Sequence, residues 1–246
     1  MAFLKDAIEA LDPAPNKKSE LTLSLNLISE MAENKVKDFD NYISEEIRTA
    51  GNGENRTIPV TEILSRHSEY RAYVKDDGAK VASEVSAAIK KFVGGGATNI
   101  IDGMSDLVTT GINAILGGGQ AAQQEMVSYY IVVRSYGMAR YDICAWSRSI
   151  EAEGITSKIE KAMAIYATKS SVDVTKISFN TFLLTYAQQL ENMGIPEKNA
   201  EEYIDAAEKL YYRLKGAGSN SPVGLENVSS TGAGLLRAPG VIYFSR

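Results

Sequence analysis

Two triple-glycine runs bracket one periodic segment, and they constrain the fold more than any other feature of the chain. Residues 97–116 stand between the two runs. An ordered glycine loses about 0.5–1 kcal/mol more backbone entropy than alanine, so a chain spends glycines where it needs unusual backbone freedom. We therefore predict a hinge at each end of this segment, formed by Gly94, Gly95, Gly96, Gly117, Gly118 and Gly119.

The bracketed segment is predicted to be an amphipathic helix. On a helical wheel its apolar residues gather on one side and its small polar residues on the other. A helix of this length measures about 30 Å, comparable with the hydrocarbon thickness of a bilayer. No Lys or Arg occurs from residue 92 to residue 133. The apolar side, which we predict to insert into a membrane or a partner, consists of Ile100, Ile101, Met104, Val108, Ile112 and Ile115.

Two interpretations of this helix follow from the pattern. In the first, residues 97–116 are a connecting helix packed against the rest of the chain. In the second, the helix is mobile, leaves the body of the protein and inserts into a membrane or a protein partner. In outline, long helices with a hinged apolar element resemble α-helical pore-forming toxins, a resemblance of architecture without a shared motif.

Outside this segment the spacing of apolar residues favours further helices. No proline lies between Pro59 and Pro196, which suits long helices. Apolar residues at three- and four-residue spacing predict helices over 19–50, 59–93, 120–153, 155–171, 173–194 and 196–216. The predicted fold class is all-α: an elongated antiparallel bundle of six or seven helices over 1–216, followed by a flexible Gly/Ser-rich tail, 217–246.

Two details of the predicted bundle stay open. Residues 128–133, "SYYIVV", are β-branched and aromatic and would also suit a strand; helix is preferred because no partner strand is evident nearby. The apolar stretch around them contains Arg134, Arg140, Asp142 and Arg148. Buried charges must be paired, so we expect ion pairs between helices. The tail ends in a short apolar run, a candidate docking peg.

Several classes of function lack the residues that they require. One histidine, His67, and one cysteine, Cys144, supply neither a metal cluster nor a thiol–imidazole pair, so no enzyme activity and no cofactor are expected. Cys144 is expected to be a buried structural thiol. The net charge of −5 and the absence of a basic cluster argue against nucleic acid. No secretory signal is recognisable, so we expect synthesis in the cytoplasm, with export by a signal-free route left open.

The sequence leads to two functional hypotheses. The first is a membrane-active helical protein, a pore-forming toxin or effector that inserts residues 97–116 into membrane lipid or a protein partner. The second is a self-assembling structural or scaffold protein that uses the hinged helix and the tail, 217–246, for contacts between subunits. Both hypotheses expect a homo-oligomer.

Overall fold

The computed structural model describes residues 15–53, 55–73, 77–94, 100–116, 123–150, 161–192, 200–217 and 240–245. Helices and strands follow one another along the chain in groups. In chain order the elements are α2 (Pro15–Thr49), β1 (Val60–Tyr73), α3 (Gly78–Gly94), α4 (Ile100–Leu116), β2 (Gln123–Arg134), β3 (Gly137–Ser149), β4 (Lys161–Val172), the 3-10 turn η2 (Val174–Lys176), α5 (Phe179–Asn192), α6 (Ala200–Ala217) and β5 (Gly240–Ser245).

The strands form a single antiparallel sheet at the centre of the molecule. Their order is β1-β4-β3-β2-β5. β2 and β3 make a hairpin whose last pair is Arg134 with Gly137, so its turn consists of Ser135 and Tyr136. β4 then runs between β3 and β1. The final strand, β5, comes from the far end of the chain and pairs with the outer side of β2.

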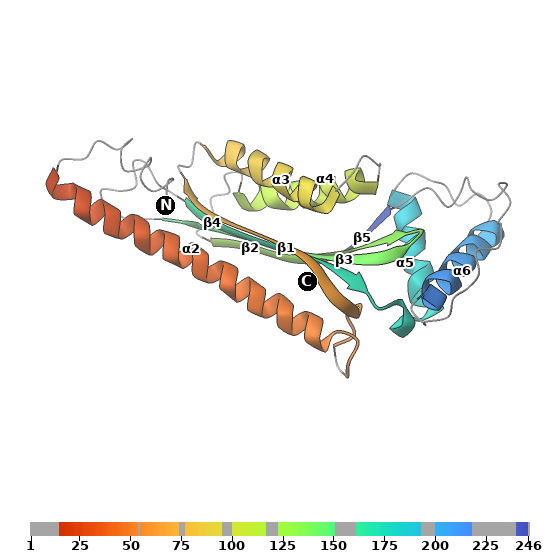
Figure 1. Ribbon diagram of the computed structural model, residues 1–246. Helices are drawn as coiled ribbons and strands as arrows, with labels where there is room; N and C mark the ends of the chain where they lie inside the picture. The colour runs from red at the N-terminus through yellow and green to blue at the C-terminus, as the bar shows by residue number, and fades with distance from the viewer. Residues whose placement is uncertain are drawn as a thin grey trace.

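Helices cover both faces of this sheet (Figure 1). The 35-residue α2 lies along one face, where Phe39 and Ile43 pack with Trp146 and Tyr166. α3 and α4 lie side by side on the other face. α5 and α6 pack at one end of the sheet around Phe182, in an apolar cluster that includes residues of β2, β3 and β4. The core is therefore three apolar clusters, each between the sheet and one group of helices.

The predicted all-α bundle is wrong, because the segments predicted as helices over 59–93, 120–153 and 155–171 contain the long strands. The strand alternative for residues 128–133 was the correct one, since they lie in β2. Strands covered on both faces become continuously apolar, and periodicity cannot distinguish such a run from a buried helix. The partners of β2 are β3, which follows it directly, and β5, more than a hundred residues away.

β1 was mistaken for a helix for a second reason. Its pairing with β4 shifts register between Val60 and Glu62 and again between Ile63 and Ser65. Each irregularity inserts a residue and changes which face the following side chains meet. Val60 and Ile63 are three residues apart, a spacing typical of one face of a helix. They nevertheless pair with residues of β4 that are two positions apart, which lie on the same face of the sheet.

The resemblance to α-helical pore-forming toxins fails together with the bundle, because an antiparallel sheet occupies the centre of the molecule. Of the helices in the described ranges, none is both long enough and apolar enough to cross a membrane. The predicted helices over 19–50, 97–116, 173–194 and 196–216 do correspond to α2, α4, α5 and α6.

The end of α4 is attached to the sheet by side chains. Ser147 Oγ donates a hydrogen bond to the carbonyl of Ile115 at 2.7 Å, and the Tyr73 hydroxyl donates to the carbonyl of Leu116 at 3.1 Å. The last carbonyls of a helix have no partner within the helix, so these bonds satisfy groups that would otherwise need water. The second glycine run thus begins directly after a helix end that is hydrogen-bonded to β1 and β3.

We predict that Ile112→Ala lowers the free energy of unfolding by about 2–5 kcal/mol, because it opens a cavity beneath α4. Ile112 has no exposed surface and packs in the core between α4 and the sheet. The exposed neighbour Asn113 is the control, and Asn113→Ala should change the same quantity by about 0.5 kcal/mol or less. Urea unfolding measures both; equal values would mean that α4 is detached from the sheet.

Candidate functional site: the outer edge of β2

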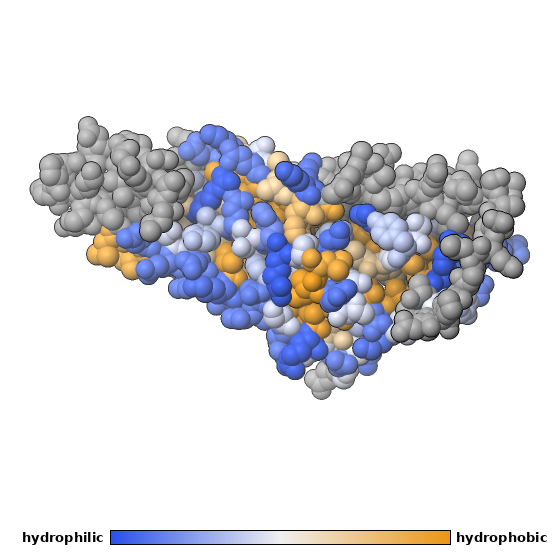
Figure 2. All heavy atoms as spheres, in the orientation of Figure 1, coloured by the Kyte–Doolittle hydropathy of each residue, from blue (hydrophilic) through white to orange (hydrophobic). Residues whose placement is uncertain are grey.

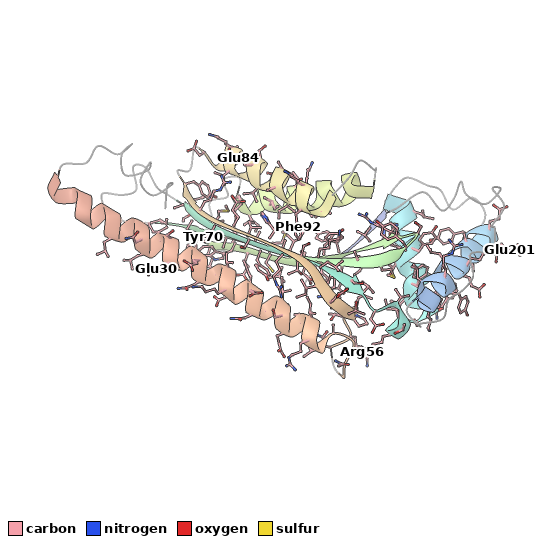
Figure 3. The ribbon with its side chains drawn as sticks, viewed as in Figure 1. Glu30, Arg56, Tyr70, Glu84, Phe92 and Glu201 are labelled. Atoms are coloured by element: carbon pink, nitrogen blue, oxygen red, sulfur yellow. The ribbon has the colours of Figure 1, made fainter. Side chains whose placement is uncertain are left out.

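The two edges of the sheet differ in how well they are protected. Edge strands present unpaired N–H and C=O groups to other chains, and charges and bulges are the usual protection. β1 forms one edge and has both, with two register shifts and a series of charged residues. Arg71 Nη1 also donates a hydrogen bond to Glu84 Oε2 of α3 at 2.6 Å. Glu84 and Phe92 are both labelled on this helix in Figure 3. The charged residues of this edge include Glu62, Arg66, Glu69 and Arg71.

The opposite edge consists of β2 with β5 laid along its outer side. From Met126 to Val133 β2 carries no charged residue. β5 covers six residues of this stretch, from Ser128, which pairs with Ser245, to Val133, which pairs with Gly240. An apolar, uncharged strand edge of this kind is prone to pair with other chains when it is left bare. β5 therefore protects the part of the sheet that most needs protection.

The sequence of β5, read backwards, closely resembles that of β2. Read backwards, 240–245 repeats the sequence of 128–133 with two differences, Phe for Tyr and Gly for Val. Aromatic and β-branched cross-strand pairs each contribute about 0.2–1 kcal/mol. In the antiparallel register, like therefore meets like: Ser128 with Ser245, Tyr129 with Phe244, Tyr130 with Tyr243, Ile131 with Ile242 and Val132 with Val241.

Gln189 of α5 closes one end of this edge. Its Oε1 accepts a hydrogen bond from the N–H of Val133, and its Nε2 donates to the C=O of Val133, both at 2.8 Å. The side chain is fully buried. The amide thus takes both backbone groups that a further strand residue would use. Gly240, with no side chain, lies opposite Val133.

Helices flank the edge on both sides. β5 contacts α4 and α5 as well as β2, and it lies between these helices in Figure 1. α4 approaches β2 closely at Gly111, where a Cβ atom would lie 2.5 Å from Sδ of Met126. Among the described residues, no strand pairs with the outer side of 123–127. The β2 edge, 123–133, is therefore closed by Gln189 at Val133 and paired with β5 along its middle. Its other end, 123–127, is open, because no described strand pairs with it there.

A buried ion pair lies beside the β2 edge, beneath the end of α2. Arg140 Nη2 is 2.7 Å from Asp142 Oδ1, and its Nη1 donates to the carbonyl of Ile58 at 3.0 Å. The guanidinium carbon lies 4.3 Å from the ring centroid of Tyr129. Burial raises the pKa of Asp142, and the Arg140 charge acts against that shift. Both charges are paired as predicted, but along one strand rather than between helices.

An open hollow of about 770 Å³ lies next to this pair. Its polar groups hold the loop before β1: Asn55 Nδ2 donates to Thr49 Oγ1 at 2.8 Å, and Asn55 Oδ1 accepts from the N–H of Thr57 at 3.1 Å. Cys144 lies nearby as a free, buried thiol whose pKa is raised by burial. No cluster of His, Cys, Asp and Glu suited to a metal ion occurs within the part of the chain that the structure describes.

The residues predicted to insert into a membrane or partner belong to α4. Val108, Ile112 and Ile115 are buried against the sheet. The side chains of Ile100, Ile101 and Met104 lie outside the described part. Gly94 is the last residue of α3, and the other hinge glycines, Gly95, Gly96, Gly117, Gly118 and Gly119, lie outside the described residues. Detachment of this helix stays a prediction.

The sequence marked the apolar end of the tail as a candidate docking peg but predicted neither a strand there nor the role of Gln189. The signal for β5 was present, because its residues repeat 128–133 in reverse order, but such a match is visible only once β2 is known to be a strand. Gln189 gave no signal, since a glutamine within an amphipathic helix is ordinary.

We predict that Gln189→Leu lowers the free energy of unfolding by about 2–5 kcal/mol, because two buried backbone groups of Val133 lose their partners. The adjacent Gln188, on the exposed side of α5, is the control, and its change to Leu should have a much smaller effect. Equilibrium unfolding in urea measures both variants. Similar values for the two would show that the Gln189 amide does not support β2.

We also predict that Asp142→Asn lowers the free energy of unfolding by about 3–5 kcal/mol, because it leaves the buried Arg140 cation unpaired. The double variant Arg140→Met/Asp142→Leu removes both charges and should recover most of this loss. Urea unfolding at neutral pH compares the two. A double variant as unstable as Asp142→Asn would contradict the assignment of the loss to an unpaired charge.

Comparison of the chain with family models, with curated proteins and with solved structures finds no match. One fold serves many functions, so the function of a protein lies in its site. In the described part of this protein, the site with the most definite geometry is the β2 edge: paired along its middle, closed by Gln189 at one end and open at the other.

Proposed function

We propose that this protein is a self-assembling structural protein whose C-terminal residues, 217–246, make the contact between subunits. The observation that supports the proposal is the pairing of β5 with β2 at the end of the chain. The 22 residues 218–239 separate β5 from α6. A fully extended chain of that length spans at most about 75 Å.

The difference between the two edges directs this contact. β1 is guarded by charges and bulges, which disfavour pairing with another chain. The β2 edge is apolar and takes a strand that belongs to no neighbouring part of the sequence. Exchange of the same element between identical subunits is a low-cost route to oligomers. The β2 edge is therefore the part of the sheet best suited to contacts between copies.

Further apolar surface is available to an assembly. Leu23 and Leu27, one helical turn apart on α2, are 62% and 57% exposed. Figure 2 shows apolar atoms near this end of α2 and across the middle of the same view. A stable interface buries about 800 Å² on each partner, more than a six-residue strand supplies alone. In this proposal α4 flanks the β2 edge, and residues 217–246 make the contact between subunits.

We expect light scattering over a range of concentrations to show a discrete species larger than the monomer. Antiparallel alternation turns the N–H of Ile242 toward β2 and that of Val241 away from it. Ile242→Pro should therefore weaken association by at least about tenfold, or ~1.4 kcal/mol. Val241→Pro is the matched control and should weaken it less. A monomer at every concentration would dismiss the proposal.

A further inference from the structure

We infer that the β2 edge accepts the β5 strand of a second copy of this chain, so that subunits are joined by strand exchange. This inference rests on the proposed function and specifies which residues meet. It concerns the described strands alone: the acceptor is 128–133 of one copy, and the donor is Gly240–Ser245 of the other.

The acceptor is shaped for one strand in one register. Because Arg134 closes the hairpin with β3, alternation turns the backbone groups of Val133, Ile131 and Tyr129 outward. Gln189 already holds Val133, which leaves Ile131 and Tyr129 to bond the incoming strand. Their partners in β5 are Ile242 and Phe244. A one-residue slip would turn every side chain of the strand to the other face.

The donor and the acceptor belong to the same sequence, so a second copy can supply the strand as well as the first. The residues of β5 repeat those of the acceptor in reverse, so each copy carries both halves of the match. A strand supplied by the same chain has an effective concentration on the order of mM, which favours the closed monomer in dilute solution. Reciprocal exchange keeps every β2–β5 contact in both copies, so the strand contacts themselves contribute equally to monomer and dimer. Additional contacts between the two surfaces then stabilise the dimer over the closed monomer.

A pair of cysteine variants tests the exchange. Ser128 and Ser245 are opposite each other at the open end of the pairing. Facing residues of antiparallel strands lie about 4.5–5.5 Å apart at Cα, within the range that a disulfide spans. Ser128→Cys and Ser245→Cys chains, each with a different tag, are produced together in one cell, purified through both tags and oxidised. The expected product is a covalent heterodimer.

Two controls make the result specific. The double variant Ser128→Cys/Ser245→Cys in one chain reports whether the pair closes within a copy. Ser135→Cys, in the exposed turn at the opposite end of β2, replaces Ser128→Cys as the collision control and should give at least tenfold less heterodimer. Disulfides found only within the double variant would overturn the inference. If light scattering then still shows the discrete assembly, exchange fails while the proposed function stands; a monomer throughout ends both.

Discussion

The outer edge of β2 must have its backbone groups satisfied, and much of the structure depends on how this is done. The strand is apolar and uncharged along most of its length. Backbone groups buried there without a hydrogen-bond partner would cost free energy, and an uncovered edge would promote aggregation with other chains. Three different parts of the protein supply the solution. β5 bonds the middle of the edge, Gln189 bonds Val133, and α4 and α5 stand on either side. The last described strand, β5, thereby completes one side of the sheet.

The buried Arg140–Asp142 pair joins elements that the apolar clusters do not. It lies at Tyr129, and through Ile58 it attaches the loop before β1 to β3. Its position, beneath the end of α2, is close to the boundary between the α2 cluster and the α5–α6 cluster. A buried ion pair contributes little net stability, so its value lies in the geometry that it imposes. Here it positions the loop and Tyr129 against the same strand.

The glycine runs acquire a structural meaning from the helices that precede them. α3 ends at Gly94 and α4 ends at Leu116, directly before the second run. Glycine is common just past the end of a helix. The end of α4 is bonded to the sheet through Ser147 and Tyr73. In this structure α4 is packed against the sheet, and its detachment stays a prediction.

The sequence by itself determined the helices that have one wet face. α2, α4, α5 and α6 were located from apolar spacing, because a helix between sheet and solvent keeps its 3.6-residue period. The ends of these helices could also be predicted, because glycine or proline lies near several of them.

Tertiary structure alone decided the sheet. β2, β3 and β4 are covered on both faces, which erases the alternation that identifies a strand, and β1 loses it at two bulges. The pairing of β2 with β5 joins residues more than a hundred positions apart, and no local pattern reports such a contact. Gln189 matters only because folding brings its amide to the backbone of Val133 on the outer side of β2. These features are long-range, so they exist in the folded chain and not in any stretch of its sequence.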